Sequence, residues 1–189
     1  MARSAQRAVY LSPDEFLLYD TPEGKAELVR GELRVTPFPG GRHGIVAKTV
    51  AVALDSLVKP SGLGFVFVDA SFELMALPRT VRAPDVAFVR AERLAPGAID
   101  DGFVKVTPDL AVEVLSPSER ASRLDEKLED YRAVGIPLIW VIDPRRRTVM
   151  ISEPNAAPRW LRTGDTLDGG SVLTDFGCPV DDLFADLAP

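Results

Sequence analysis

Two acidic residues occupy positions where a core strand would normally carry apolar side chains. Glu113 lies inside the run 110–115, whose other members are apolar, and Asp85 begins the similar run 85–89. A buried carboxylate is costly unless it is paired, protonated or bound to a metal ion. Both residues are therefore candidates for chemistry. The alternatives are a strand-end cap for Asp85 and a structural ion pair for Glu113.

A lysine is the third unusual residue. Apolar residues recur at helical spacing over 124–134, and Lys127 lies beside that stripe, on the helix expected directly after the Glu113 strand. In one interpretation its ammonium group extends to the surface and pairs with Glu126 or Asp130. In the other it joins the two carboxylates, and we favour this interpretation because both acids are present.

Two carboxylates and a lysine suit the cleavage of a phosphodiester bond. Mg²⁺ or Mn²⁺ prefers oxygen ligands such as the carboxylates of Asp85 and Glu113. The ion would polarise the phosphoryl group and acidify a bound water, while Lys127 orients that water or stabilises developing charge. Asp109 shares a strand face with Glu113 by the two-residue period and is an alternative ligand. We rank it below Asp85 because Pro108-Asp109 is typical of the start of a strand.

The elements that must position these residues follow from apolar periodicity. Residues 109–115 predict a strand, a helix follows as far as Val134 with Gly135 as its stop, and 138–142 predicts a central strand buried on both faces. A strand–helix–strand succession of this length is a crossover unit. Glu113 and Lys127 therefore belong to adjacent elements.

The remaining elements make the predicted sheet mixed. A capping box at Ser12 predicts a helix start, Arg30-Gly31 a hairpin within 26–36, and apolar spacing a helix from Ile45 towards Pro60 after a loop that contains His43. Further strands are predicted over 64–77, 81–90 and 148–152. We expect an α/β (mixed α+β) fold, a central mixed sheet flanked by helices, in a single domain spanning 1–189.

Composition excludes several classes of protein. The 189 residues include one Cys and one His, which rules out a disulfide framework, a Cys-rich zinc site and any site that needs two imidazoles. The N-terminus lacks the apolar region of a signal peptide, and the longest apolar stretch, 136–142, is too short to span a bilayer. We therefore expect a cytoplasmic protein without a membrane partner.

The net charge of −6 at first argues against a nucleic-acid partner, but the acidity is concentrated. The C-terminal segment 163–189 holds six aspartates and no base, so the first 162 residues carry 22 acids and 22 bases. A basic face can exist there. The turn formed by Arg145, Arg146 and Arg147 is a candidate contact to a DNA backbone, with a solvated loop tip as the alternative.

Three ordered motifs resemble the Uma-two family, within the PD-(D/E)XK restriction-endonuclease-like superfamily. They are APDVAFV at 83–89, PDLAVEVLSPS at 108–118, and Lys127 and Tyr131 followed by Gly135-Ile136 and WVIDP at 140–144. The resemblance covers nearly the whole chain, from Leu11-Ser12 to Leu183-Phe184. It implies a restriction-endonuclease-like sheet flanked by helices and a divalent-metal nuclease site.

The resemblance also implies roles for single residues. Asp85 matches the PD aspartate, Glu113 the acid of (D/E)XK, and the backbone carbonyl of Val114 a third protein ligand. The motif lysine is replaced by Leu115, and Lys127 is similar to a relocated lysine that reaches the same strand end.

Two earlier residues match the family as well. Glu27 matches an early acidic position that adds a metal ligand or positions a water, with an exposed hairpin acid as the alternative. His43 precedes the long helix and is a candidate phosphate contact, with a capping loop histidine as the alternative.

Two functions follow. The first is a Mg²⁺- or Mn²⁺-dependent endonuclease that hydrolyses DNA, for which a homodimer would match the two-fold symmetry of a duplex. The second is a catalytically inactive nucleic-acid-binding or protein-interaction module on the same fold, suggested by Leu115 and the acidic segment. A Lys127 ammonium within hydrogen-bond range of both carboxylates would favour the enzyme.

Overall fold

The computed structural model describes residues 8–74, 76–99, 101–117 and 121–187. The first seven residues lie outside these ranges, and so does part of the N-terminal stretch from which we expect no signal peptide. The last residue of the motif at 108–118 also lies outside them. In the described part of the chain, no helix combines the length and the apolar character that crossing a membrane requires.

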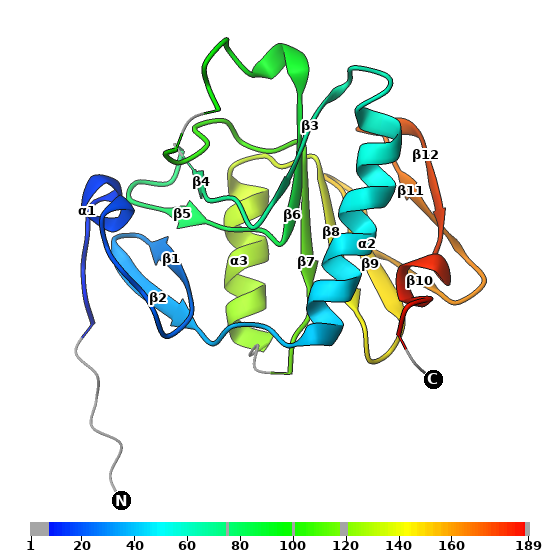
Figure 1. Cartoon of the computed structure of the whole chain (residues 1–189), viewed down its shortest axis with the longest axis horizontal. Coiled ribbons are helices and arrows are strands. Elements are labelled where there is room, and N and C mark those ends of the chain that lie inside the picture. The colour runs from blue at the N-terminus through cyan, green and yellow to red at the C-terminus, as the bar shows by residue number, and fades with distance from the viewer. Residues whose placement is uncertain (1–7, 75, 100, 118–120, 188–189) are drawn as a thin grey trace, which may run out of the picture.

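A six-stranded mixed sheet forms the centre of the molecule (Figure 1). Among the described strands, β7 and β8 pair in parallel, and every other neighbouring pair in this sheet is antiparallel. The parallel pair is joined through a helix, as the predicted crossover unit requires. In spatial order the strands are β10 (Arg159–Arg162), β9 (Thr148–Ser152), β8 (Leu138–Asp143), β7 (Leu110–Val114), β6 (Val86–Arg90) and β3 (Gly64–Val68).

Helices cover both faces of this sheet. The α2 helix (Gly41–Val58) packs on one face, where Leu110, Val112 and Val114 of β7 enter the larger apolar core. The α3 helix (Ala121–Ala133) packs on the other face with Ala111. Because side chains alternate along a strand, Glu113 lies on the α3 face with Ala111.

A smaller sheet adjoins the α3 side. It consists of β2 (Glu32–Thr36), β1 (Lys25–Val29), β5 (Val81–Arg82) and β4 (Phe72–Glu73), in that order, with α1 (Pro13–Leu17) packed nearby through Phe16. The β1–β2 turn has Arg30 at φ 50° and Gly31 at φ 88°. Two positive φ angles define the tight hairpin turn whose twist matches the strands, so the predicted hairpin is confirmed.

The acidic C-terminal segment is part of the folded core. Residues 163–187 form β11 (Thr166–Gly169), β12 (Leu173–Pro179) and the short η2 helix (Asp182–Phe184), which pack against α2. The rings of Phe176 and Trp140 are in tilted contact, with centroids 5.4 Å apart. The aspartates alternate with buried apolar residues, so the segment holds the sheet and α2 together.

Several predicted boundaries need correction. The α2 helix begins at Gly41, so His43 lies in its first turn and not in a preceding loop. The predicted strand 64–77 is divided by a turn at Asp69, whose φ is 52°. The predicted strand 81–90 is divided at residues 83–85, and η1 (Ala91–Arg93) follows it. The breaks matter because Asp69 and Asp85 both lie in them.

Candidate active site

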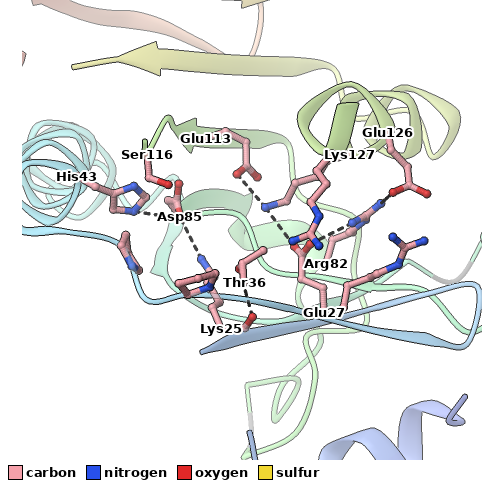
Figure 2. A pocket seen from close by; sticks show the side chains of 14 residues that line it. Lys25, Glu27, Thr36, His43, Arg82, Asp85, Glu113, Ser116, Glu126 and Lys127 are labelled. Atoms are coloured by element: carbon pink, nitrogen blue, oxygen red, sulfur yellow. Dashed lines mark hydrogen bonds and ion pairs between the residues drawn. The ribbon is translucent and has the colours of Figure 1, made fainter. Parts of the chain in front are cut away.

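A cleft opens between the β1–β2 hairpin, the start of α2, the α3 helix and the end of β7 (Figure 2). Its volume is about 70 Å³, which leaves room for a small ion or a few waters. The lining residues are predominantly charged or polar: Lys25, Glu27, Arg34, Thr36, Pro37, Pro39, His43, Arg82, Asp85, Glu113, Ser116, Arg123, Glu126 and Lys127.

The topology explains why these residues meet. Parallel pairing places the C-terminal ends of β7 and β8 at one edge of the sheet, with Val114 opposite Ile142. The α2 and α3 helices both begin at this edge, the lower one in Figure 1. Lys25 and Glu27 are two residues apart on β1, and both side chains therefore face the cleft.

Glu113 is held by two donors from α3. Lys127 Nζ donates to Oε2 at 2.8 Å, and the Tyr131 hydroxyl donates to Oε1 at 2.7 Å. The donors are four residues apart and lie on one face of the helix. Glu113 is 2% exposed, so both carboxylate oxygens receive their hydrogen bonds from inside the protein.

Asp85 lies across the cleft and has different partners. Its Oδ2 accepts from the backbone N–H of Val114 at 2.8 Å, and its Oδ1 accepts from Lys25 Nζ at 2.9 Å. His43 Nε2 lies 3.4 Å from the same Oδ1. Asp85 is therefore fixed by the end of β7 on one side and by β1 and α2 on the other.

Lys127 is buried, so the interpretation that it extends to the surface is wrong. Besides Glu113 it contacts Glu27 Oε1 at 3.1 Å and the carbonyl oxygen of Ala83 at 3.3 Å. Within the described residues no contact joins Lys127 to Asp85, whose ammonium partner is Lys25. The Lys127 ammonium is thus within hydrogen-bond range of Glu113 but has no contact with Asp85, so the expectation of contact with both carboxylates is met for one of them.

Glu27 is enclosed by cations and is not an exposed hairpin acid. Arg82 Nη1 donates to Oε2 at 3.0 Å, and the Ala83 N–H donates to Oε1 at 2.9 Å. Arg82 also binds Asp130, which in turn accepts from Arg30 at 2.7 Å. This chain of ion pairs connects the β1–β2 hairpin to α3.

The pKa values of Glu113 and Lys127 are both raised, with different consequences for the two partners of this ion pair. Burial raises the pKa of Glu113 to about 7; the charge of Lys127 opposes this rise, and the charges of Asp85 and Glu27 add to it. Burial would lower the pKa of Lys127, but the carboxylates of Glu113, Glu27 and Asp85 hold it well above its usual range. Lys127 therefore stays an ammonium ion, and Glu113 is the group that titrates near neutrality.

Asp85 stays ionised. Burial would raise its pKa, but the hydrogen bond with His43 and the charges of Lys25 and Lys127 hold that pKa well below its usual range. For His43, burial lowers the pKa, but the hydrogen bond to Asp85 and the Asp85 charge outweigh burial and raise it. The Val114 backbone contributes in the same direction.

The donor set fits a hard divalent cation. Mg²⁺ is commonly bound through one or two carboxylates and completes its coordination with water and phosphate oxygens. Asp85 and Glu113 supply the carboxylates, and the Val114 backbone lies beside Asp85. In the described part of the chain, no three side chains of His, Cys, Asp or Glu are grouped to hold a metal. Water or substrate would therefore have to complete the coordination shell.

Asp109 lies away from the cleft. Its carboxylate accepts from the Arg90 backbone N–H at 3.0 Å and pairs with Arg93 at 2.8 Å. Asp109 lies four residues before Glu113, which along a strand corresponds to about 13 Å. Asp109 is therefore poorly placed to act as the alternative metal ligand that the two-residue period suggested.

The Arg145–Arg147 turn is exposed and connects β8 to β9. It lies at the same edge of the sheet as the C-terminal end of β7, because β7 and β8 are parallel. The Asp143 carboxylate accepts the backbone N–H groups of Arg145 and Arg146 and shapes the turn. The Arg146 guanidinium also lies 3.8 Å from Asp143, and the side chains of both arginines are exposed at this edge.

Four residues of the site escaped the sequence analysis as functional candidates. The two-residue period of a strand could have identified Lys25, because Lys25 shares a strand face with Glu27. Tyr131 was assigned to the apolar stripe, where its hydroxyl carried no separate signal. Arg82 and Asp130 are paired across 48 residues, a separation at which no local pattern predicts contact.

The mixed sheet flanked by helices is the restriction-endonuclease-like fold expected from the sequence. The structure is similar to that of a "putative nuclease belonging to DUF820" from Anabaena variabilis, with a TM-score of 0.78 and 21% sequence identity. The similarity covers 93% of this chain and 98% of that one. The chain belongs to the Uma2 family, described as "putative restriction endonuclease", whose profile matches residues 13–181. No curated protein matches the chain. The resemblance seen in the sequence motifs is thus confirmed, as is the fold class.

Proposed function

We propose that this protein is a divalent-metal-dependent endonuclease that hydrolyses phosphodiester bonds in DNA. The buried Lys127–Glu113 ion pair at 2.8 Å, facing Asp85 across the cleft, carries this proposal. The pair supplies the positive charge and the acid that the superfamily motif normally carries on one strand, here divided between β7 and α3. Membership of the Uma2 family supports the nuclease class.

Asp85, Glu113 and the carbonyl of Val114 would hold Mg²⁺ or Mn²⁺. When bound there, such an ion would polarise a phosphoryl group and lower the pKa of a water. Lys127 stays protonated, so it stabilises negative charge on the phosphate or orients water, and does not act as a base. Glu27 fixes the Lys127 ammonium through its 3.1 Å contact, which makes Glu27 a positioning residue in this scheme.

Cations around the cleft suit a polyanionic substrate. Lys25, Arg34 and Arg123 line it, and Arg145 and Arg146 extend from the same edge of the sheet. Basic groups of this kind contact phosphate oxygens and position the duplex without reading its sequence. Over its described residues, 163–187, the acidic segment packs on the α2 face and does not line the cleft. A homodimer would place two such clefts on a duplex, which light scattering with and without DNA would test.

The second candidate is a nucleic-acid-binding module without catalysis. Leu115 in place of the motif lysine and the engagement of Asp85 by Lys25 favour it. A DNA cleavage assay separates the two candidates, because the module would bind DNA without cutting it.

The experiment is nicking of supercoiled plasmid, and cleavage of single-stranded DNA, with Mg²⁺ or Mn²⁺ and with EDTA. Glu113→Gln and Asp85→Asn should abolish metal-dependent nicking. Asp109→Asn is the matched control, because it also neutralises a buried carboxylate next to β7 but lies away from the cleft. Equal nicking by the wild type and a folded Glu113→Gln variant would refute the site. DNA binding without cleavage by the wild type would favour the module.

A further inference from the structure

Lys25 bridges two carboxylates at the mouth of the cleft. Its ammonium lies 2.9 Å from Asp85 Oδ1 and 2.7 Å from Asp69 Oδ1. The Asp85 side chain is buried, whereas the Asp69 side chain is 65% exposed. Figure 2 shows Lys25 reaching Asp85 from β1, on the side opposite the Glu113–Lys127 pair.

The two oxygens of Asp85 are not equally available to a cation. Oδ2 accepts the Val114 N–H, a hydrogen bond that the end of β7 fixes. Oδ1 is the oxygen that meets Lys25 and His43. A divalent ion at Asp85 would need Oδ1, where a positive ammonium already lies in direct contact. Two cations at one carboxylate oxygen repel each other, most strongly in a site shielded from water.

We propose that Lys25 is a displaceable internal counter-ion of the metal site. It neutralises Asp85 while no metal is bound, and it moves fully to Asp69 when a divalent ion takes Oδ1. The inference rests on the proposed function, because it assumes that Asp85 is a metal ligand. Lys25 is in this scheme a positioning residue that sets how much divalent ion the site requires.

Asp69 is placed to receive the released ammonium. Its backbone N–H donates to the backbone carbonyl of Asp85 at 3.2 Å, which fixes the turn beside the site. Lys25 already contacts Asp69, so displacement breaks one of two ion pairs and requires only a change in a flexible side chain. The exposure of Asp69 lets water solvate the charges after the move.

The test is Mn²⁺ binding in the absence of DNA, measured from the free-ion signal in electron paramagnetic resonance. Lys25→Met removes the competitor and should tighten binding by about tenfold, the equivalent of one charge-assisted hydrogen bond. Asp69→Asn should weaken binding severalfold, because Lys25 then has Asp85 as its remaining carboxylate. Asn tolerates the positive φ at this turn, so the backbone should be unchanged.

Lys48→Met is the matched control. Lys48 pairs with Asp186 at 3.0 Å on the surface, so this variant also loses a lysine ion pair but should bind Mn²⁺ like the wild type. Equal or weaker binding by Lys25→Met, with Asp85→Asn still abolishing binding, would overturn the inference and leave the proposed metal site intact. Absence of Mn²⁺ binding in every folded variant would overturn both.

Discussion

The Tyr131 hydroxyl donates to Glu113 at 2.7 Å, one helical turn beyond the lysine that binds the other oxygen of the same carboxylate. Tyr131 is fully buried, and burial together with the charges of Glu113 and Glu27 raises its pKa well above the usual range. The hydroxyl therefore keeps its proton and acts as a permanent donor. The acid on β7 is thus oriented entirely by one face of α3.

The Tyr131→Phe variant should have a lower free energy of unfolding and a higher pKa for Glu113. The loss of a hydrogen bond to a charged group costs roughly 1.5–3 kcal/mol in the free energy of unfolding, measurable by urea denaturation. The bond also favours the ionised form of Glu113, so the acidic limb of the nicking rate should move to higher pH. An unchanged pH profile would show that the hydroxyl has only a structural role.

Lys127→Met should abolish nicking and destabilise the fold. It leaves Glu113 and Glu27 buried without their shared ammonium, and breaking a buried ion pair costs about 3–5 kcal/mol. Glu27 keeps its ion pair with Arg82, so Glu113 is the carboxylate left without a cation, and the double variant Lys127→Met with Glu113→Gln should recover part of that stability, but no activity. Recovery of nicking along with stability would contradict the role proposed for Lys127.

Divalent-ion affinity should rise with pH across neutrality. Burial raises the pKa of Glu113 to about 7, so below pH 7 a proton competes with the metal for the carboxylate. Between pH 8 and pH 6 the affinity for Mn²⁺ should fall about tenfold, because ligands must be deprotonated to bind. Isothermal titration calorimetry would measure this. Burial lowers the pKa of His43, but the hydrogen bond and charge of Asp85 outweigh burial and raise it, so His43→Gln should retain the pH dependence if Glu113 causes it.

The arginine turn between β8 and β9 should contribute to the salt dependence of DNA binding. Each phosphate contact adds a slope of about −0.9 to the plot of log affinity against log salt for duplex DNA. Replacing Arg145 and Arg146 with alanine should therefore flatten the slope by up to about two such contacts. Fluorescence anisotropy with a labelled duplex would measure it, and an unchanged slope would assign the turn to solvent.

Truncation after Gly164 should unfold the protein. It deletes apolar residues of the larger core, among them Leu167, Leu173, Phe176 and Phe184. If the segment were a separate acidic tail over the cleft, the truncated chain would instead fold and bind DNA more tightly. Circular dichroism and thermal melting separate these outcomes, and a cooperative transition in the truncated chain would contradict the packing described above.

The strand–helix–strand unit could be predicted because its signals are local. Alternation put Glu113 on one strand face, helical spacing put Lys127 beside the apolar stripe, and Gly135 ends the helix with a φ of 77°. The crossover rule then placed strand and helix next to each other. The pairing of Glu113 with Lys127 needed no information from distant parts of the chain.

The other half of the cleft depends on long-range contacts. Lys25 meets Asp85 across 60 residues, and Arg30 meets Asp130 across 100. No local pattern determines which acid a given cation will find at such separations. The acidic segment was misleading for another reason, because the charge count drew attention away from buried apolar residues such as Phe176 and Val180.

The ion-pair chain from the hairpin to α3 has a consequence for how the protein is made. The Arg30–Asp130 contact spans 100 residues, and Lys127 is the last of the cleft residues to be synthesised. A nascent chain that ends before α3 holds Asp85 and Glu113 without Lys127, and the core still lacks the residues after 163. The cleft therefore cannot be completed until α3 has been made, and the larger core that supports it also requires residues after 163.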